Sequence, residues 1–221
     1  GIDPGSSSNV TIIHSWIDNG DDNVAIKTGT THMSVIDDHF YSGHGMSIGS
    51  ETNTGVSDLL VDGVTEDHTT SGVRIKSNAT RGGLVENLTY RNMCLRDVPI
   101  PIAISPYYNN QTTEGFVDPG IKGNRIPEYR KITLENITDT TPGDVLIAGY
   151  DADHRTQVDL KNVTITGITP DKLHLKLADI GDRGTNLPLA KAAEGNEVTV
   201  TKLEGAKAKP YSCAGKFVPM R

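Results

Sequence analysis

The chain has 221 residues, which is enough for one sizeable domain, and its 23 Gly and 11 Pro indicate many turns. Its formal net charge of −7 argues against nonspecific nucleic-acid binding, which needs a basic surface, although a local basic patch can still bind a polyanion. The chain contains no apolar run of about 18 residues, so no membrane-spanning helix is expected.

A short alternation of apolar and other residues recurs along the chain and predicts strands with one buried face. Five of these segments are followed by a second one after 13 or 14 residues, whereas the pairs themselves are unevenly spaced. A constant phase inside an irregular period is typical of stacked solenoid coils with insertions on one side. In chain order the segments are 9–12, 24–26, 33–35, 46–48, 59–61, 73–75, 88–90, 102–104, 132–134, 145–147 and 163–165.

We therefore predict an all-β fold, a right-handed single-stranded parallel β-helix that extends over residues 1–221 as one domain. A β-sandwich also has many short strands, but its strands would not keep the same offset through five units. The apolar residues of each alternation are the expected core: Val10, Ile12, Val24, Ile26, Met33, Val35, Met46, Ile48, Leu59, Val61, Val73, Ile75, Leu88, Tyr90, Ile102 and Ile104.

The chain enters this pattern almost at once. A solenoid that began at residue 1 would expose the unpaired edge and the apolar end of the coil that contains Val10 and Ile12. The chain also begins at Gly1 rather than at Met. We therefore expect further N-terminal coils in the natural protein, of which these residues would be the C-terminal part.

Two acids and a histidine occupy the same phase of consecutive coils. Asp22 lies two residues before Val24, and His44 lies two residues before Met46. Equivalent positions of stacked coils are about 4.8 Å apart, which predicts Asp22 and His44 as neighbours, with Asp21 beside them. Strict alternation would turn both side chains inward, so both must belong to the turn that precedes each strand.

Two cations follow one coil further on. Arg74 and Lys76 flank the inward Ile75 and are expected to point outward on the same side as the acids. Such a face suits a carboxylated sugar chain, because one acid can protonate the leaving oxygen, a carboxylate can activate water, and cations can neutralise substrate carboxylates. Adjacent acids repel, which would raise one pKa. Each feature alone is more typical of a turn or a solvated strand face, but they converge on consecutive coils.

The ordered motifs G-D-D (20–22), G-H-G (43–45) and R-I-K (74–76) resemble the signature of family 28 glycoside hydrolases, the polygalacturonases. The stretch 43–57, R-G-G (81–83) and I-A-I-S-P-Y-Y (102–108) look most like the bacterial exo-acting members. The resemblance implies a secreted or periplasmic enzyme of pectin degradation. It would cleave α-1,4-galacturonosyl bonds with inversion of configuration, from the chain end.

By the same resemblance, Asp21 is the general acid. Asp22 activates the water together with a third aspartate, which would lie immediately upstream of Gly1. His44 controls the hydrogen bonding and protonation of the acid. We accordingly expect low activity from residues 1–221 alone.

The resemblance also assigns substrate-binding residues. Arg74 and Lys76 would grip a galacturonate carboxylate, and Tyr108 would contact the sugar. The expected partner is therefore galacturonan or an oligogalacturonate, with no cofactor, metal, nucleic acid or membrane. A monomer is expected, which could associate with its own N-terminal fragment.

Three alternatives stay open at this point. A rhamnogalacturonan or other modified-pectin hydrolase would share the fold, but the cations of R-I-K favour unsubstituted galacturonate. A pectate lyase is also a β-helix and would use Ca²⁺ and a basic residue for β-elimination. A noncatalytic carbohydrate-binding β-helix would bind the same polymer without turnover.

Two further features have more than one interpretation. Cys94 and Cys213 can form one bridge or remain separate thiols, and they support neither a disulfide framework nor a metal site. Six N-x-[ST] sequons suggest glycosylation, but four coincide with strand entries, so a preference for turns explains them better. The six are Asn9, Asn78, Asn87, Asn110, Asn136 and Asn162.

Overall fold

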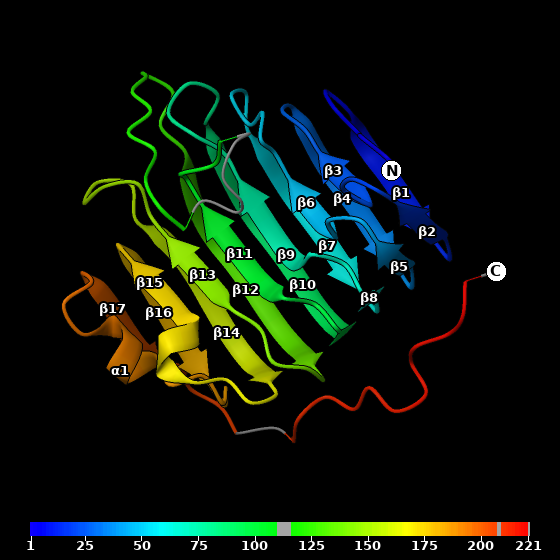
Figure 1. The fold of residues 1–221 in the computed structure, drawn as a ribbon. Coiled ribbons are helices and arrows are strands. Elements are labelled where there is room, and N and C mark those ends of the chain that lie inside the picture. The colour runs from blue at the N-terminus through cyan, green and yellow to red at the C-terminus, as the bar shows by residue number, and fades with distance from the viewer. Residues whose placement is uncertain (110–115, 207–208, 221) are drawn as a thin grey trace.

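The computed structural model describes residues 1–109, 116–206 and 209–220. Its strands run parallel and wind into successive coils that stack along one axis, as Figure 1 shows. Each coil pairs with the next in register; Val24, for example, lies opposite Met46, which lies opposite Val73. The fold is the predicted parallel β-helix.

The second members of the predicted pairs form one side of the solenoid. They build a six-stranded parallel sheet in which neighbouring strands come from neighbouring coils. From one edge to the other its strands are β3 (Val24–Ile26), β6 (Met46–Ile48), β9 (Ser71–Lys76), β11 (Ile100–Ser105), β13 (Val145–Ala148) and β15 (Leu173–Lys176).

The remaining strands form an eleven-stranded parallel sheet. Its main path is β1 (Ser8–Ile13), β4 (Thr30–Ile36), β7 (Val56–Asp62), β10 (Leu84–Arg96), β12 (Glu128–Asp139), β14 (Thr156–Ile165), β16 (Ala178–Arg183) and β17 (Val198–Lys202). Three short strands lie off this path: β2 (Trp16–Asn19), β5 (His39–Ser42) and β8 (Thr65–Asp67).

A third strand segment in several coils was not predicted; it is formed by β2, β5, β8 and the second halves of β10 and β12. The long strand β10 pairs with β7 through its first half and with β8 through its second half, so it occupies two strand positions of its coil. Two inward positions of this segment carry acids, Glu66 and Asp139, which are fully buried. An alternation rule that expects apolar residues inside therefore misses these strands.

The prediction for residues 163–165 was wrong in register. We expected them to continue the first set after 132–134, but Ile132 pairs with Val158, and Val163 pairs with Ile137. The equivalent segment is therefore 158–160. The strand β14 bends at Asn162, whose φ is 55°, and so carries two apolar alternations, between which the sequence pattern alone does not choose.

Asparagines mark the bends of several coils. Asn9, Asn87, Asn136 and Asn162 all have φ between 53° and 59°, a left-handed conformation that Asn tolerates better than most residues. The Asn162 amide donates to Asn136 Oδ1 at 2.8 Å, and the Asn136 amide donates to Asn92 Oδ1 at 3.1 Å. This ladder supports the turn interpretation of these sequons; Asn110 lies outside the described residues.

The core agrees with the prediction. Every expected core residue is buried except Val10, which is partly buried and packs against the core. Polar residues are buried too, and two of them are acids: burial raises the pKa of Glu66 to about 8 and that of Asp139 to about 7. Near pH 7 Glu66 is therefore largely protonated, whereas Asp139 is protonated in about half of the molecules.

Short helices lie near the end of the described coils that contains β17. The 3-10 helix η1 (Pro170–Lys172) precedes β15, and α1 (Leu189–Ala193) packs against β15 and β17 with Leu189 and Ala192 buried. Figure 1 shows α1 beside β17. Among the described residues, neither helix has the length and apolarity needed to cross a membrane.

Residues 209–220, which we call the C-terminal strap, run back across the coils against the direction of the chain. Figure 1 shows the strap leaving the β17 end and passing toward the β5 end. A disulfide between Cys94 and Cys213 fixes it to β10 and answers the open question about the two cysteines. Its contacts join Lys209 to Asn162, Tyr211 to Thr138, Cys213 to Cys94, Phe217 to Arg96, and Val218 to Tyr41.

Loss of this disulfide should destabilise the protein. The bridge closes a loop with a sequence separation of 119, and such a crosslink restricts the unfolded chain, a contribution of about 2–4 kcal/mol. We expect Cys94→Ala/Cys213→Ala to unfold at a lower urea midpoint than the oxidised protein. Because the double variant also leaves a small cavity, the reduced wild-type protein is the control. Equal midpoints for the reduced and oxidised wild type would contradict this expectation.

Candidate active site

The turns that precede β3 and β6 carry the predicted acids and histidine. Asp22 and His44 both lie in these turns and not in the strands, as expected. Gly45 has a φ of +79°, and a Cβ there would lie 2.0 Å from the Ser71 carbonyl oxygen. Only glycine therefore fits directly after His44.

Asp22 is a buried, ionised carboxylate, with 5% of its surface exposed. Its Oδ1 accepts hydrogen bonds from Ser47 Oγ at 2.7 Å and Arg74 Nη1 at 2.6 Å, and its Oδ2 accepts one from Lys76 Nζ at 2.8 Å. Burial alone would raise the pKa of Asp22, but Lys76 and Arg74 outweigh burial and hold this pKa below its usual range.

Arg74 and Lys76 differ from the prediction in their exposure. Ile75 between them is in the core, so both face away from it, as predicted. They are nevertheless buried, with 4% and 6% exposed, because Asp22 binds them both. Burial lowers the pKa of Lys76, and Arg74 lowers it further, against the opposing effect of Asp22. The outward face that we expected to bind a sugar carboxylate is thus occupied by a buried ion cluster with Asp22.

Asp21 differs from Asp22 in its exposure and in its hydrogen-bond partners. Its side chain is 84% exposed, and its Oδ1 accepts the Asp22 backbone N–H at 2.8 Å. The predicted contact of His44 is made with Asp21 rather than with the Asp22 carboxylate: His44 Nε2 lies 4.0 Å from Asp21 Oδ1, and the His44 N–H donates to the Asp21 carbonyl oxygen at 2.9 Å. The expected rise of one pKa in this pair does not fall on Asp22, whose pKa is lowered.

Tyr108 lies next to the cations of the cluster. Its ring centroid is 5.1 Å from Lys76 Nζ and 5.9 Å from Arg74 Cζ, within the range of cation–π attraction. The ring is half-buried, and the Tyr108 N–H donates to the Ser77 carbonyl oxygen at 2.9 Å. All six predicted site residues therefore lie on or beside the six-stranded sheet.

Sequence reasoning missed three residues that support this arrangement. Ser47 binds Asp22, Thr70 Oγ1 lies 2.8 Å from His44 Nδ1, and Asn23 Oδ1 accepts the N–H of Gly45 at 2.9 Å. A signal was available for Ser47, because it occupies the same outward position of β6 that Arg74 occupies of β9. Nothing in the sequence pattern marks Thr70 or Asn23.

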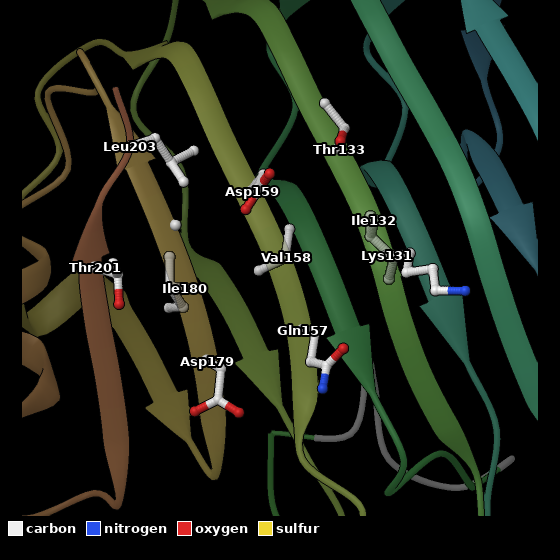
Figure 2. A pocket seen from close by; sticks show the side chains of 11 residues that line it. Lys131, Ile132, Thr133, Gln157, Val158, Asp159, Asp179, Ile180, Thr201 and Leu203 are labelled. Atoms are coloured by element: carbon white, nitrogen blue, oxygen red, sulfur yellow. The ribbon is translucent and has the colours of Figure 1, made fainter. Parts of the chain in front are cut away.

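A surface hollow of about 460 Å³ lies elsewhere, over β12, β14, β16 and β17 of the eleven-stranded sheet. Figure 2 shows Lys131, Asp159 and Asp179 among its lining side chains. Asp159 is paired with Lys161, and Asp179 with Arg155. The hollow contains none of the predicted site residues, so it is not the candidate site.

One group in the described part of the chain has metal-ligand spacing, Asp67, His68 and Asp97. Asp67 already receives hydrogen bonds from Arg96 on both carboxylate oxygens. A metal ion would have to displace the Arg96 guanidinium from the Asp67 carboxylate, so we assign no metal site to these residues.

Comparisons with known proteins agree on one family. The family model for glycosyl hydrolases family 28 matches residues 1–181. A polygalacturonase of Ralstonia solanacearum is 33% identical over all of this chain and 45% of its own length. An endo-polygalacturonase of Pectobacterium carotovorum subsp. carotovorum is 40% identical over 75% of this chain and 40% of its own length.

A solved structure gives the same result. The exopolygalacturonase of Thermotoga maritima superposes with a TM-score of 0.74 at 25% identity, over 85% of this chain and 43% of that chain. The chain thus spans less than half the length of the proteins it matches.

Asp22→Asn should be strongly destabilising, by about 3–5 kcal/mol, because it leaves two buried cations facing a neutral amide. Asp21→Asn is the matched control. Its amide oxygen still accepts the Asp22 N–H and its position is exposed, so its effect should stay within about 0.5 kcal/mol. Urea unfolding at pH 7 measures both, and equal losses would contradict the ion-cluster description.

The stability lost in Asp22→Asn should also depend on pH. Because the pKa of Asp22 is lowered on folding, its contribution is present above the unfolded pKa of about 3.9 and is lost as the pH falls through the folded value. The stability difference between wild type and Asp22→Asn should therefore be constant near neutrality and narrow in acid. A difference that widens in acid would have the wrong sign.

Proposed function

The chain belongs to glycosyl hydrolases family 28, and on that premise we propose that the protein carrying it hydrolyses the α-1,4-galacturonosyl bonds of polygalacturonate. The observation that supports this most strongly is the pair Asp21–Asp22. One carboxyl group is exposed, while its sequence neighbour is buried and kept ionised by Lys76 and Arg74. Hydrolysis of a glycosidic bond needs two carboxyl groups in these two different roles.

In the proposed mechanism Asp21 is the general acid and gives its proton to the leaving glycosidic oxygen as the bond from that oxygen to the anomeric carbon breaks. A water molecule attacks the anomeric carbon from the opposite face and gives its proton to the carboxylate of Asp22. The configuration inverts, which requires the acid and base carboxyl groups to stand about 6.5–9.5 Å apart across the bond. His44, 4.0 Å from Asp21 Oδ1, controls the hydrogen bonding of the acid.

Arg74, Lys76 and Tyr108 form the proposed binding site for a galacturonate unit beside the cleaved bond. The Lys76 ammonium binds the Asp22 carboxylate and also lies 5.1 Å from the centroid of the Tyr108 ring. A sugar that contacts this ring would therefore lie close to a positive charge. A uronate carboxylate gains from this charge, whereas a neutral sugar does not.

A third aspartate is proposed to share the base role with Asp22. Ile2 pairs with Val24, and the Ile2 N–H donates to the Asn23 carbonyl oxygen at 3.0 Å, so Gly1 lies one coil away from the turn that carries Asp22 and a residue directly before Gly1 would continue along that turn. We propose that this residue is the third aspartate that the family signature implies.

Two finer proposals rest on the resemblance. The first is action from the chain end; the similar proteins include both an endo-polygalacturonase and an exopolygalacturonase, so product sizes must decide. The second is export to the periplasm or the medium, which the disulfide supports because such bonds persist in oxidising compartments.

The test is incubation of the protein with polygalacturonate and analysis of the products. We expect new reducing ends, saturated products and release of small products from the start. Ultraviolet-absorbing unsaturated products or loss of activity in EDTA would indicate a lyase instead, and faster cleavage of rhamnogalacturonan would indicate the modified-pectin hydrolase.

Asp21→Asn should reduce kcat by roughly 10²–10⁴-fold with oligogalacturonate binding retained, because only the proton donor is removed. Binding is measured by calorimetry and turnover by reducing ends. Unchanged turnover in this variant would exclude Asp21 as the acid, and binding without any turnover in the wild type would favour the noncatalytic alternative.

A further inference from the structure

Glu66 is a buried acid that the proposed mechanism does not use, and it lies directly behind the turn that carries His44. It projects inward from β8 with none of its surface exposed. Its Oε1 accepts the Met46 N–H at 3.2 Å, and its Oε2 lies 2.9 Å from Thr69 Oγ1. A Cβ on Gly45 would lie 2.6 Å from Oε2, so the carboxyl group packs flush against the backbone that follows His44.

The hydrogen bonds around Thr69 determine where the proton is. Thr69 Oγ1 lies 2.9 Å from Glu66 Oε2 and 2.9 Å from the Ser71 carbonyl oxygen. A hydroxyl group has one proton to donate, and a carbonyl oxygen only accepts. Both contacts are satisfied when Thr69 donates to Ser71 and Glu66 donates to Thr69, which requires a protonated Glu66.

The electrostatic surroundings agree with this assignment. Burial, with a smaller contribution from the nearby Asp139, raises the pKa of Glu66 to about 8 against the opposing effect of the hydrogen bonds with Thr69 and Met46. The other titratable group that faces it is Tyr90, whose pKa is also raised by burial. No cation contributes to its pKa among the described residues, in contrast to Asp22.

Each oxygen of the Glu66 carboxyl group is connected to His44 through a short chain of contacts. One oxygen holds Met46, two residues after His44, and the other holds Thr69, whose neighbour Thr70 places its hydroxyl oxygen 2.8 Å from His44 Nδ1. We propose that Glu66 is a positioning residue which, as a neutral carboxylic acid, joins the two turns between which the His44 ring is held. This proposal rests on the role of His44 in the proposed function.

Ionisation of Glu66 would break the arrangement. A carboxylate cannot donate to Thr69, so the Thr69 hydroxyl would have to turn toward Glu66 and release the Ser71 carbonyl oxygen. The turn that carries Thr70 would then lose one of its anchors. Activity should therefore decline as the pH rises through the pKa of Glu66.

Two substitutions separate the proton from the side chain. Glu66→Gln keeps the shape, the acceptor for Met46 and a donor for Thr69 at every pH. The ratio of its activity to that of wild type should therefore be near one in mild acid and rise as the pH passes through the pKa of Glu66, while any loss of the Asp21 proton affects both proteins equally. Glu66→Leu removes both hydrogen bonds and leaves the Met46 N–H unpaired; its kcat should fall roughly tenfold to a hundredfold with a smaller change in KM. Both are measured as kcat and KM on polygalacturonate against pH.

Asp139 supplies the matched control. It is equally buried, and burial raises its pKa to about 7, but its Oδ1 accepts the Thr141 N–H and hydroxyl, on a turn that does not contact His44. Asp139→Asn and Asp139→Leu should leave kcat in mild acid unchanged, whatever they do to stability. Because the Asp139 charge contributes to the raised pKa of Glu66, these variants should move the alkaline decline in activity to lower pH without abolishing it. Equal effects from Asp139→Leu and Glu66→Leu would reduce Glu66 to a general structural role and overturn the proposal.

The ring nitrogens of His44, observed by NMR without substrate, give a readout that does not need turnover. We expect Glu66→Leu to shift these signals and change the tautomer, and Glu66→Gln to preserve them; Glu66→Gln decides alone if the Leu variant does not fold. Unchanged His44 signals in Glu66→Leu, or a ratio of Glu66→Gln to wild-type activity that stays constant with pH, would overturn the proposal. A wild-type protein without polygalacturonate hydrolysis would refute the proposed function instead, and the His44 signals would still test the positioning.

Discussion

The arrangement of the site depends on parallel, in-register stacking of the coils. Neighbouring strands lie about 4.8 Å apart, so residues one or two coils apart become spatial neighbours however long the intervening loops are. Asp22 and Arg74 are separated by 52 positions in the sequence and by two coils in space. Loop length can therefore change freely on one side of the solenoid while the turns before β3 and β6 keep their alignment.

The strand β6 (Met46–Ile48) separates two electrostatic environments. Its Met46 N–H binds the inner acid Glu66, and the hydroxyl of the adjacent Ser47 binds the outer acid Asp22. Two cations surround Asp22 and lower its pKa, whereas Glu66 meets apolar groups and another acid and its pKa rises. Both acids are buried, so burial alone does not determine the charge; the partners that each face of the strand provides decide it.

The sequence was sufficient to predict the stacking and the core, and to place the six candidate site residues near one sheet, because apolar alternation and motif order do not depend on loop length. It was not sufficient for contacts that depend on side-chain length and turn conformation. Arg74 and Lys76 occupy outward positions, yet they are buried because Asp22 binds them. An alternation rule predicts which way a side chain points, but not whether another side chain covers it. The third strand segment was missed in β8 and at the end of β12 because acids, Glu66 and Asp139, occupy inward positions there. The predicted register of Val163 was wrong because the left-handed conformation of Asn162 bends β14, whereas the alternation pattern assumes a straight strand.

The C-terminal strap has a mechanical consequence. A solenoid held only by contacts between neighbouring coils peels from its end, one coil at a time, when tension is applied there. Here the chain end is joined covalently to β10 through Cys94, so tension applied beyond Cys213 passes directly to that strand. The coils between residues 94 and 213 lie in a closed loop that bears none of this load. Under force, the last coils of the solenoid are thus the protected ones, and the coils before β10 are the first to yield.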